Sequence, residues 1–324
     1  MSMNLLEIEN LKTYFFTEAG VVKALDGVTF NVEKGCTIGL VGESGSGKSV
    51  TAQSVLRIVP RPGRIVGGKI LFNGEDILAK KESEMRSYRG KKISLIFQDP
   101  TSSLNPVFTI GNQLSDIVMQ HNRVKKDEAA EAVVKALKLV KLPDPEEALT
   151  RYPHQFSGGM KQRICIARAL LLNPDLLFAD EPTTNLDVTI QAQIIALLVD
   201  LQKNIGLTLV MITHDMGIVT QMCKCVVVLY AGKVMEIGSI EKIFEMPHPY
   251  TEALLKAVPR LDQTRKLISI PGNIPNLIEP PSGCRFHPRC QYAVERCKEE
   301  VPPLQDVGGG HMISCHRWRE LNGG

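Results

Sequence analysis

A glycine-rich segment carries the clearest chemical signal in this sequence. Residues 42–49 read GESGSGKS, which fits the pattern G-x-x-x-x-G-K-[ST]. Its glycines allow backbone N–H groups to turn inward around phosphate oxygens, and the start of the following helix adds positive potential. Lys48 can reach the β and γ phosphates of a nucleotide, while the Ser49 hydroxyl can bind Mg²⁺. We therefore predict a nucleotide site with contacts from Ser44, Gly45, Ser46, Gly47, Lys48, Ser49 and Val50.

Two adjacent carboxylates, Asp180 and Glu181, end a later apolar run at residues 176–179. A charge at the end of a buried strand is costly unless a metal or a substrate uses it. Asp180 fits a residue that organises Mg²⁺. Glu181, one position on, would point to the opposite side of the chain and could polarise the attacking water as a general base. The alternative, two acids at an ordinary strand end, is less favoured because a phosphate-binding loop lies upstream.

The segments that must position these residues alternate between strand and helix. A short apolar run at 37–41 precedes the glycine-rich loop, and a helical pattern at 48–58 follows it. The order returns with a buried strand at 175–179, a helix at 189–204 and a strand at 207–212. Continuous apolar strands suit a sheet that is covered on both faces. We therefore predict an α/β core with a largely parallel sheet.

The chain divides by composition into a core and an extension. A length of 324 residues suits one full domain and a smaller appendage. We predict a core domain over residues 1–245, with a helical subdomain at about 100–170. Prolines are frequent after residue 240, so we predict a loop-rich extension over 246–324. Such a segment needs an additional stabilising link besides its small core.

Composition also restricts the partners and the compartment. The net charge of +3 is the difference between 38 basic and 35 acidic residues, so nucleic acid is not a favoured partner. No apolar run approaches the roughly 18 to 20 residues that a membrane-spanning helix needs. The opening ten residues lack the basic start and apolar stretch of a signal peptide. We expect a cytoplasmic protein that does not itself span a membrane.

The C-terminal extension contains four of the eight cysteines. In a reducing compartment such a cluster suggests a metal rather than disulfides. Four thiolates could hold tetrahedral Zn²⁺ or an iron–sulfur cluster, and the spacing alone does not choose between them. Incidental, unligated cysteines are the alternative. The predicted ligands are Cys284, Cys290, Cys297 and Cys315.

Further landmarks give the sequence a specific family resemblance. Residues 156–163 read FSGGMKQR, which resembles the signature segment of ABC ATPases. The other landmarks follow in that family's order, with Gln98 in a Q-loop, residues 185–187 as a D-loop and His214 as the switch histidine. The resemblance covers residues from about 5 to 240. It implies an ABC-type P-loop NTPase core with an antiparallel β edge and a helical subdomain.

The resemblance implies that two such domains close head to tail around two ATP molecules. In the family the signature residues form a second anion-binding helix start, which caps the γ-phosphate bound by the other subunit. Ser157, Gly158 and Gly159 occupy that position here, and Asp187 belongs to the D-loop.

Single residues receive further roles from the resemblance. Gln98 would bind Mg²⁺ or the lytic water and couple the helical subdomain to a transmembrane partner, and His214 would contact the γ-phosphate. Phe15 matches the aromatic residue that stacks on adenine, with Tyr14 as the alternative on the other face of its strand. Asn185 replaces the small D-loop residue common in the family, which leaves the rate of communication between sites open. Because Glu181 and the signature are intact, we predict a Mg²⁺-dependent ATPase.

The extension resembles that of the dipeptide and oligopeptide importer ATPases. The resemblance rests on residues 248–251 (HPYT), residues 271–275 (PGNIP) and the cysteine segment. In that group the four cysteines are linked to a [4Fe-4S] cluster, which we adopt as the hypothesis over Zn²⁺. His287 lies between the predicted ligands, and we interpret it as a residue that supports the ligands or packs beside them rather than as a ligand. We interpret Cys223 and Cys225, outside the extension, as buried apolar thiols.

The implied function is to energise dipeptide or oligopeptide uptake through separate transmembrane subunits. The implied partners are two permease subunits, a second ABC ATPase subunit in a heterodimer and, indirectly, an extracytoplasmic peptide-binding protein. The chain would lie on the cytoplasmic face of the membrane. One alternative is a soluble ABC ATPase acting on nucleic acid or ribosomes, but such proteins usually carry a coiled-coil insertion or a second ATPase domain. An exporter subunit is disfavoured by the extension.

Overall fold

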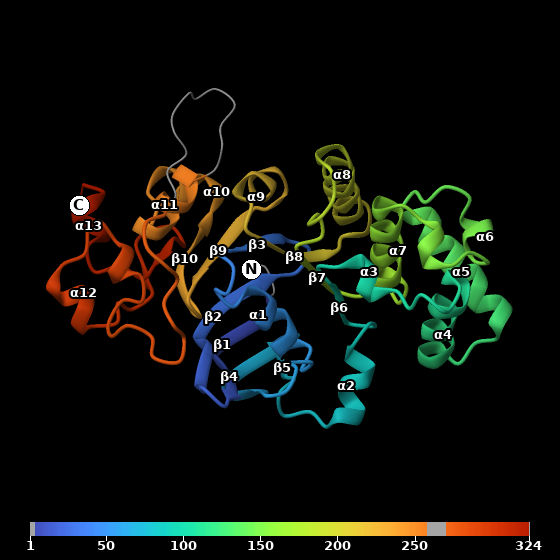
Figure 1. Cartoon of the computed structure of the whole chain (residues 1–324), viewed down its shortest axis with the longest axis horizontal. Helices are drawn as coiled ribbons and strands as arrows, with labels where there is room; N and C mark the ends of the chain where they lie inside the picture. The colour runs from blue at the N-terminus through green and yellow to red at the C-terminus, as the bar shows by residue number, and fades with distance from the viewer. Residues whose placement is uncertain (1–3, 258–269, 324) are drawn as a thin grey trace. The chain divides into compact units, whose positions relative to one another are not determined.

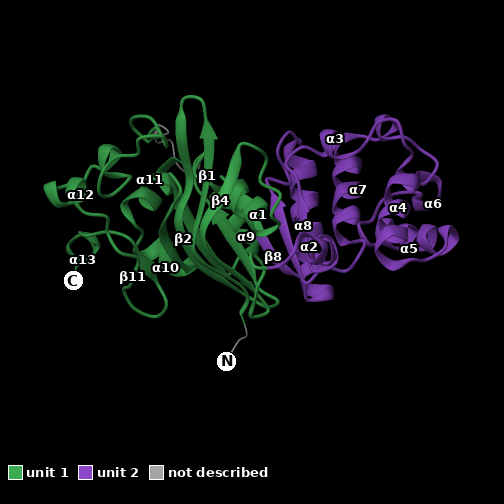
Figure 2. Cartoon of the chain, turned by 90° about the horizontal axis from the view of Figure 1, so that it is seen from below, with its two compact units in different colours: residues 1–79, 211–324 green, residues 80–210 purple. Residues whose placement is uncertain are grey.

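A computed structural model describes residues 4–257 and 270–323 of the chain. Residues 1–3 of the opening segment and residues 258–269 of the predicted extension lie outside the described part. The chain forms two compact units, shown in Figure 2, which we describe separately. Unit 1 contains residues 1–79 and 211–324, and unit 2 contains residues 80–210. The predicted division between residues 245 and 246 stays a prediction.

An antiparallel sheet in the order β2-β1-β4-β5 forms the first part of unit 1 (Figure 1). Its strands are β1 (Asn4–Thr17), β2 (Gly20–Glu33), β4 (Gly63–Phe72) and β5 (Glu75–Asp76). Apolar side chains on one face of β2 alternate with exposed positions on the other, as expected for a sheet with one covered face. The alternating buried positions at the end of β2 are Val28, Phe30 and Val32.

A second set of strands in unit 1 positions the glycine-rich loop. Strand β3 pairs in parallel with β9, and β9 pairs antiparallel with β10. All five residues of β3 are buried. Helix α9 packs so closely against this strand that a Cβ at Gly39 would lie 2.7 Å from Val219 Cγ1. The elements are β3 (Thr37–Val41), α1 (Lys48–Val55), α9 (Met216–Met222), β9 (Cys225–Tyr230) and β10 (Lys233–Ser239).

The C-terminal extension in unit 1 adds to this sheet rather than standing apart from it. Strand β12 pairs with β10 through Glu236 and Ile313, and β11 pairs with β12. The buried Glu236 carboxylate accepts a hydrogen bond of 3.1 Å from His248 N and lies 2.7 Å from His311 Nε2. The elements are α10 (Ile240–Glu245), α11 (Pro249–Ala257), η2 (His287–Arg289), α12 (Glu295–Glu299), β11 (Gln305–Asp306), β12 (Met312–Ile313) and α13 (Trp318–Leu321).

Unit 2 combines a parallel strand pair with a group of helices. Strands β6 and β7 are parallel and buried throughout. Helix α5 packs on α4 and α7, and it buries Ala129, Val133 and Leu137 on one face, at helical spacing. The elements are α2 (Glu82–Tyr88), β6 (Ile93–Ile96), α3 (Pro100–Ser103), α4 (Ile110–Asn122), α5 (Lys126–Leu139), α6 (Pro145–Ala148), η1 (Pro153–Gln155), α7 (Gly158–Leu170), β7 (Leu176–Asp180) and α8 (Val188–Ile205).

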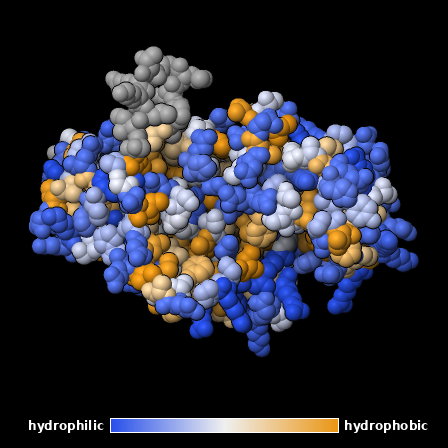
Figure 3. Space-filling view, in the orientation of Figure 1, coloured by the Kyte–Doolittle hydropathy of each residue, from blue (hydrophilic) through white to orange (hydrophobic). Residues whose placement is uncertain are grey.

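The observed elements confirm the predicted α/β core. Strand β8 (Thr208–Thr213), fully buried, crosses the boundary between the two units in the sequence. The surface view in Figure 3 shows hydrophilic residues with small hydrophobic groups among them. Among the described residues, no helix combines the length and the apolar character that crossing a membrane requires.

Candidate functional site

The glycine-rich loop in unit 1 runs from the end of β3 to the start of α1. Gly42 and Gly47 have positive φ angles of 150° and 108°. A Cβ at Gly42 would lie 2.1 Å from Leu229 O, and one at Gly47 would lie 2.8 Å from Ala24 O. These two positions therefore require glycine for space as well as for backbone conformation.

The loop presents unsatisfied polar groups that suit an anion. Helix α1 begins without a side-chain cap, since its N-cap residue is Gly47, and the start of a helix favours an anion. Among the described residues, the buried Ser46 Oγ has no hydrogen-bond partner. Lys48 Nζ is buried and donates to Gly42 O at 2.8 Å and to Glu43 O at 2.9 Å. The lysine is thus held on the carbonyl groups that open the loop.

The other residues predicted from the loop lie beside it. Ser44 and Gly45 are exposed on the loop, while Ser49 and Val50 are half-buried in the first turn of α1. His214 is exposed and directly follows β8. This arrangement agrees with the predicted phosphate contacts, which stay a prediction.

The two aromatic candidates for adenine stacking differ in their contacts. Tyr14 Oη donates to Asp26 Oδ1 at 2.8 Å, and burial together with this bond raises the pKa of Tyr14 to about 12. Burial alone would raise the pKa of Asp26, but the Tyr14 hydroxyl and the charges of Lys233 and Arg285 outweigh it and lower that pKa. Because Tyr14 is committed to Asp26, the adenine assignment stays with Phe15 as a prediction.

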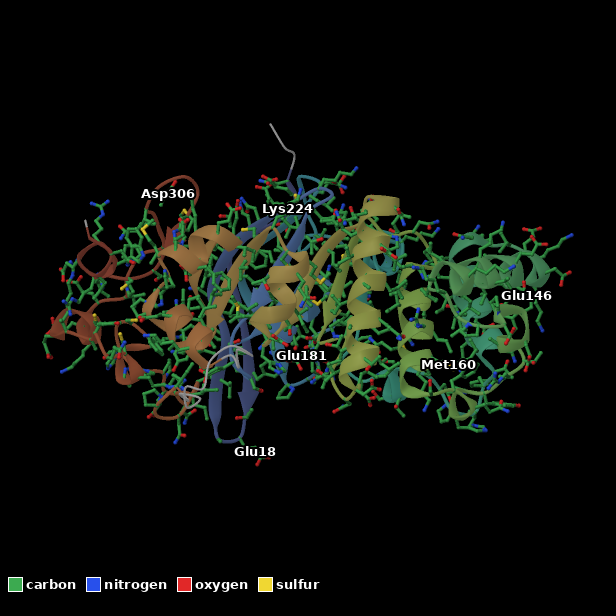
Figure 4. All side chains as sticks on the ribbon, turned by 90° about the horizontal axis from the view of Figure 1, so that it is seen from above. Glu18, Glu146, Met160, Glu181, Lys224 and Asp306 are labelled. Atoms are coloured by element: carbon green, nitrogen blue, oxygen red, sulfur yellow. The ribbon has the colours of Figure 1, made fainter. Side chains whose placement is uncertain are left out.

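Unit 2 brings Gln98 and Glu181 together. Gln98 Nε2 donates to Glu181 Oε2 at 2.9 Å, and Thr184 Oγ1 donates to the same oxygen at 3.0 Å. Glu181, labelled in Figure 4, has a φ of 44°, which a non-glycine residue rarely adopts. Such strain is common where a side chain must be aimed for function. Asp180, the last residue of β7, is buried.

The signature and D-loop residues both lie at helix starts in unit 2. Ser157 is the N-cap of α7, and its hydroxyl accepts from Met160 N at 3.4 Å. Gly158 and Gly159 form the first turn, and a Cβ at Gly159 would lie 2.7 Å from Ile190 Cγ2. Asp187 caps α8 by accepting from Ile190 N at 3.0 Å. Ser157 and Asp187 therefore have a structural use as caps besides their predicted contacts with a second protomer.

The four extension cysteines line one cavity in unit 1, together with His248, Phe286 and His287. Burial raises the pKa of the Cys284 thiol to about 12 and that of the Cys315 thiol to about 11, with the neighbouring cysteines adding to it. In the described part of the chain, however, no three His, Cys, Asp or Glu side chains are grouped so that they could hold a metal ion. The predicted metal-binding character of the extension is therefore not supported, although its cysteines do converge.

Two smaller predictions concern nearby side chains. His287 Nδ1 lies 2.9 Å from the carbonyl oxygen of Cys284, one of the predicted ligands, and its role stays a prediction. Cys223 is buried as predicted, whereas Cys225 is half-buried. Burial raises the pKa of Cys223 to about 12 and that of Cys225 above its usual value.

Comparison with known proteins connects both units to one family. The family profile described as "ABC transporter" matches residues 25–184, and that described as "Oligopeptide/dipeptide transporter, C-terminal region" matches residues 235–297. The chain belongs to the ABC transporter family of ATP-binding proteins. It is accordingly an ATP-hydrolysing enzyme of the ABC type.

Similar proteins from several bacteria extend over almost the whole chain. The oligopeptide transport ATP-binding protein OppD of Escherichia coli K12 is 46% identical, with 97% of this chain and 93% of that protein covered. The dipeptide transport ATP-binding protein DppD of Bacillus subtilis 168 is also 46% identical, over 96% of this chain and 93% of that protein. A probable peptide ABC transporter ATP-binding protein, y4tR of Sinorhizobium fredii, is 47% identical over 98% of this chain and 96% of its own length.

Solved structures agree with the ABC ATPase fold. The ATP-binding cassette MJ0796, solved as a dimer with ADP and Pi, is 26% identical with a TM-score of 0.65 over 72% of this chain and 98% of that one. The cbiO1 protein of Clostridium perfringens is 30% identical, with a TM-score of 0.63 over 74% of this chain and 90% of that one.

Proposed function

We propose that this chain is the motor subunit that energises dipeptide or oligopeptide uptake through separate transmembrane subunits. The observation that carries the proposal is the extent of the similarity to OppD and DppD proteins, which covers the ATPase core and the C-terminal region together. An ATPase acting on nucleic acid or ribosomes is not favoured, because the similar proteins are named as peptide transport subunits.

ATP binding begins, in this proposal, at the loop of residues 42–49. A triphosphate would draw Lys48 Nζ away from the carbonyls of Gly42 and Glu43, and would offer the buried Ser46 hydroxyl a partner. The uncapped start of α1 adds N–H donors and positive potential. Mg²⁺, with Ser49, Gln98 and Asp180 as the predicted ligands, would neutralise charge on the phosphates.

Hydrolysis is assigned to Glu181 as the general base. The hydrogen bonds from Gln98 Nε2 and Thr184 Oγ1 to Glu181 Oε2 fix the orientation of the carboxylate. A carboxylate held in this way can take the proton of an attacking water. His214 is proposed to contact the γ-phosphate.

A second ATPase subunit would complete the site. The start of α7, with Ser157 as its cap, would close on the γ-phosphate bound by the partner. The dimeric state of MJ0796 in the similar structure supports this arrangement. We propose a heterodimer with a second, different ATPase subunit.

The cysteine cavity is proposed to hold a [4Fe-4S] cluster. No three His, Cys, Asp or Glu side chains among the described residues are grouped so that they could hold a metal ion, so the proposal rests on the shared cavity of the cysteines. Convergence of all four cysteines on one cavity supports the cluster. Because burial disfavours the thiolates, they need a cationic partner to stay deprotonated. Anaerobically purified protein that lacks iron and sulfide would contradict this assignment.

The transmembrane partners are proposed to dock on unit 2. Val107 and Phe108, two adjacent apolar residues in the segment between α3 and α4, are 70% and 52% exposed, and we propose that the partner covers them. The chain would then be peripheral on the cytoplasmic face, and an extracytoplasmic peptide-binding protein would be an indirect partner.

A pull-down from native membranes tests the function. We expect two integral membrane subunits and a second ATPase to copurify, and peptide transport in vesicles to require ATP. Stable association with ribosomes or DNA, without membrane subunits, would contradict the proposal.

A further inference from the structure

A partly buried ion pair connects the C-terminal extension to the phosphate loop within unit 1. Arg289 Nη1 donates to Glu43 Oε2 at 2.6 Å, and Arg289 Nη2 donates to Glu43 Oε1 at 3.0 Å. The Arg289 side chain is 5% exposed and that of Glu43 is 23% exposed. Glu43 is the second residue of the loop at 42–49. A two-pronged, shielded pair of this kind fixes the orientation of both side chains.

A second contact holds the same loop residue by its backbone. Glu43 N donates to Tyr250 Oη at 2.9 Å. The Tyr250 ring packs on Tyr230 and on Phe286, with ring centroids 4.6 and 5.1 Å apart, and Arg289 Nη1 also donates to Tyr230 Oη at 3.2 Å. The extension therefore forms hydrogen bonds with both the side chain and the backbone amide of Glu43.

The turn that carries Arg289 also carries one of the cavity cysteines. Arg289 is the last residue of η2, and Cys290 follows it directly. Arg289 N donates to Phe286 O at 3.0 Å, and Cys290 N donates to His287 O at 3.2 Å. Phe286 and Cys290 both line the four-cysteine cavity. One short, hydrogen-bonded turn therefore connects the cavity cysteine with the arginine.

We propose that Arg289 is a positioning residue for ATP binding, and that the four-cysteine site acts on the phosphate loop through it. The carbonyl of Glu43 is one of the two that hold Lys48 Nζ. A fixed Glu43 keeps this part of the loop in one conformation, so less ordering is needed when phosphate binds. The inference rests on the proposed phosphate contacts of residues 42–49, and it adds a regulatory connection to them.

A double-mutant cycle on the full chain tests the first half of the inference. Equilibrium dissociation constants for ATP with Mg²⁺ are measured for the wild type, Arg289→Ala, Glu43→Gln and the double variant. We expect each single change to weaken ATP binding by about tenfold, within the usual range of coupling between sites. The double variant should bind no worse than either single variant, because Arg289 acts through Glu43.

Arg285→Ala is the matched control. Arg285 comes from the same segment, is likewise 5% exposed, and pairs with Asp26 at 2.6 Å rather than with the loop. If the extension acted only as a structural clamp, Arg285→Ala and Arg289→Ala would change ATP affinity alike. Additive effects in the cycle, or an unchanged affinity in folded Arg289→Ala protein, would overturn the proposal. Arg289→Lys, which keeps the charge but loses the fork, should give an intermediate affinity if Arg289→Ala fails to fold.

The proposed action of the four-cysteine site through Arg289 is tested by Cys290→Ser. This substitution should weaken ATP binding in the wild-type background but not in the Arg289→Ala background. Equal effects in both backgrounds would remove the cysteine site from the connection. Failure of the proposed nucleotide site is recognised separately, because Lys48→Ala would then leave ATP binding intact.

Discussion

Replacing Glu181 with glutamine should abolish turnover while leaving the site intact. Both donors to this side chain, Gln98 Nε2 and Thr184 Oγ1, reach the same oxygen, Oε2. A glutamine can place its carbonyl oxygen there and keep both hydrogen bonds, so we expect a stability change within about 0.5 kcal/mol. The amide cannot accept the proton of water at its nitrogen. Loss of a general base lowers turnover by about 10²- to 10⁴-fold, which is about 3 to 5 kcal/mol in activation free energy.

Two measurements on the same preparation separate hydrolysis from binding. Phosphate release from the purified transporter reports turnover, and equilibrium binding of ATP with Mg²⁺ reports affinity. We expect turnover to collapse at unchanged affinity in Glu181→Gln. Thr184→Val is the matched control, because it removes one hydrogen-bond donor but keeps the carboxylate. It should lower turnover less than Glu181→Gln does. Undiminished turnover in Glu181→Gln would refute the role of Glu181.

Three further predictions follow from local geometry. Gly42→Ala should lower the free energy of unfolding by several kcal/mol, because its Cβ would lie 2.1 Å from a backbone carbonyl oxygen. Gly45→Ala is the control, since no described atom lies within 4 Å of its Cβ, and it should lower the free energy of unfolding by about 1 kcal/mol. Thermal unfolding measures both changes. Ser157→Ala removes the N-cap of α7, so it should lower the free energy of unfolding by about 1 kcal/mol. It should also abolish ATP-dependent dimerisation, measured by light scattering. Dimers that persist in this variant would contradict the role of the signature serine. The lowered pKa of Asp26 stabilises the fold above the unfolded pKa, a contribution that is lost as pH falls through the folded value. Melting curves of Asp26→Asn should therefore depend less on pH in the acid range, and an unchanged dependence would contradict this.

Local patterns were sufficient to predict the core elements and the positions where the loop needs glycine. The strand predicted at 37–41 coincides with β3, and the helix predicted at 189–204 lies within one residue of α8 at each end. These segments combine continuous apolar runs or helical periodicity with clear glycine boundaries, so nearest neighbours in the sequence carry the information. The glycines at 42 and 47 likewise follow from a pattern that demands positive φ.

The sequence contains no comparable pattern that predicts contacts between distant residues. Arg289 and Glu43 are 246 positions apart, and neither the cysteine spacing nor the loop pattern indicates that they meet. The RFHPR run at 285–289 does not indicate which acidic residues its two arginines meet. Pairing of β12 with β10 was missed because a two-residue strand has no periodicity to detect.

The prediction of a metal-binding extension, with a [4Fe-4S] cluster preferred over Zn²⁺, is not supported by the structure. Sequence spacing shows that cysteines are frequent, but the distances between thiols depend on how the turns around η2 and α12 fold. The four cysteines line one cavity, yet no three His, Cys, Asp or Glu side chains among the described residues are grouped so that they could hold a metal ion.

The most direct test of the account is a structure of the assembled transporter, carrying Glu181→Gln, with ATP and Mg²⁺ bound. We predict that the γ-phosphate is contacted by Lys48 of one ATPase subunit and by the signature serine of the other, with Ser157 of this chain on the nucleotide of its partner. A closed, ATP-loaded complex in which Ser157 lies away from any triphosphate would contradict it.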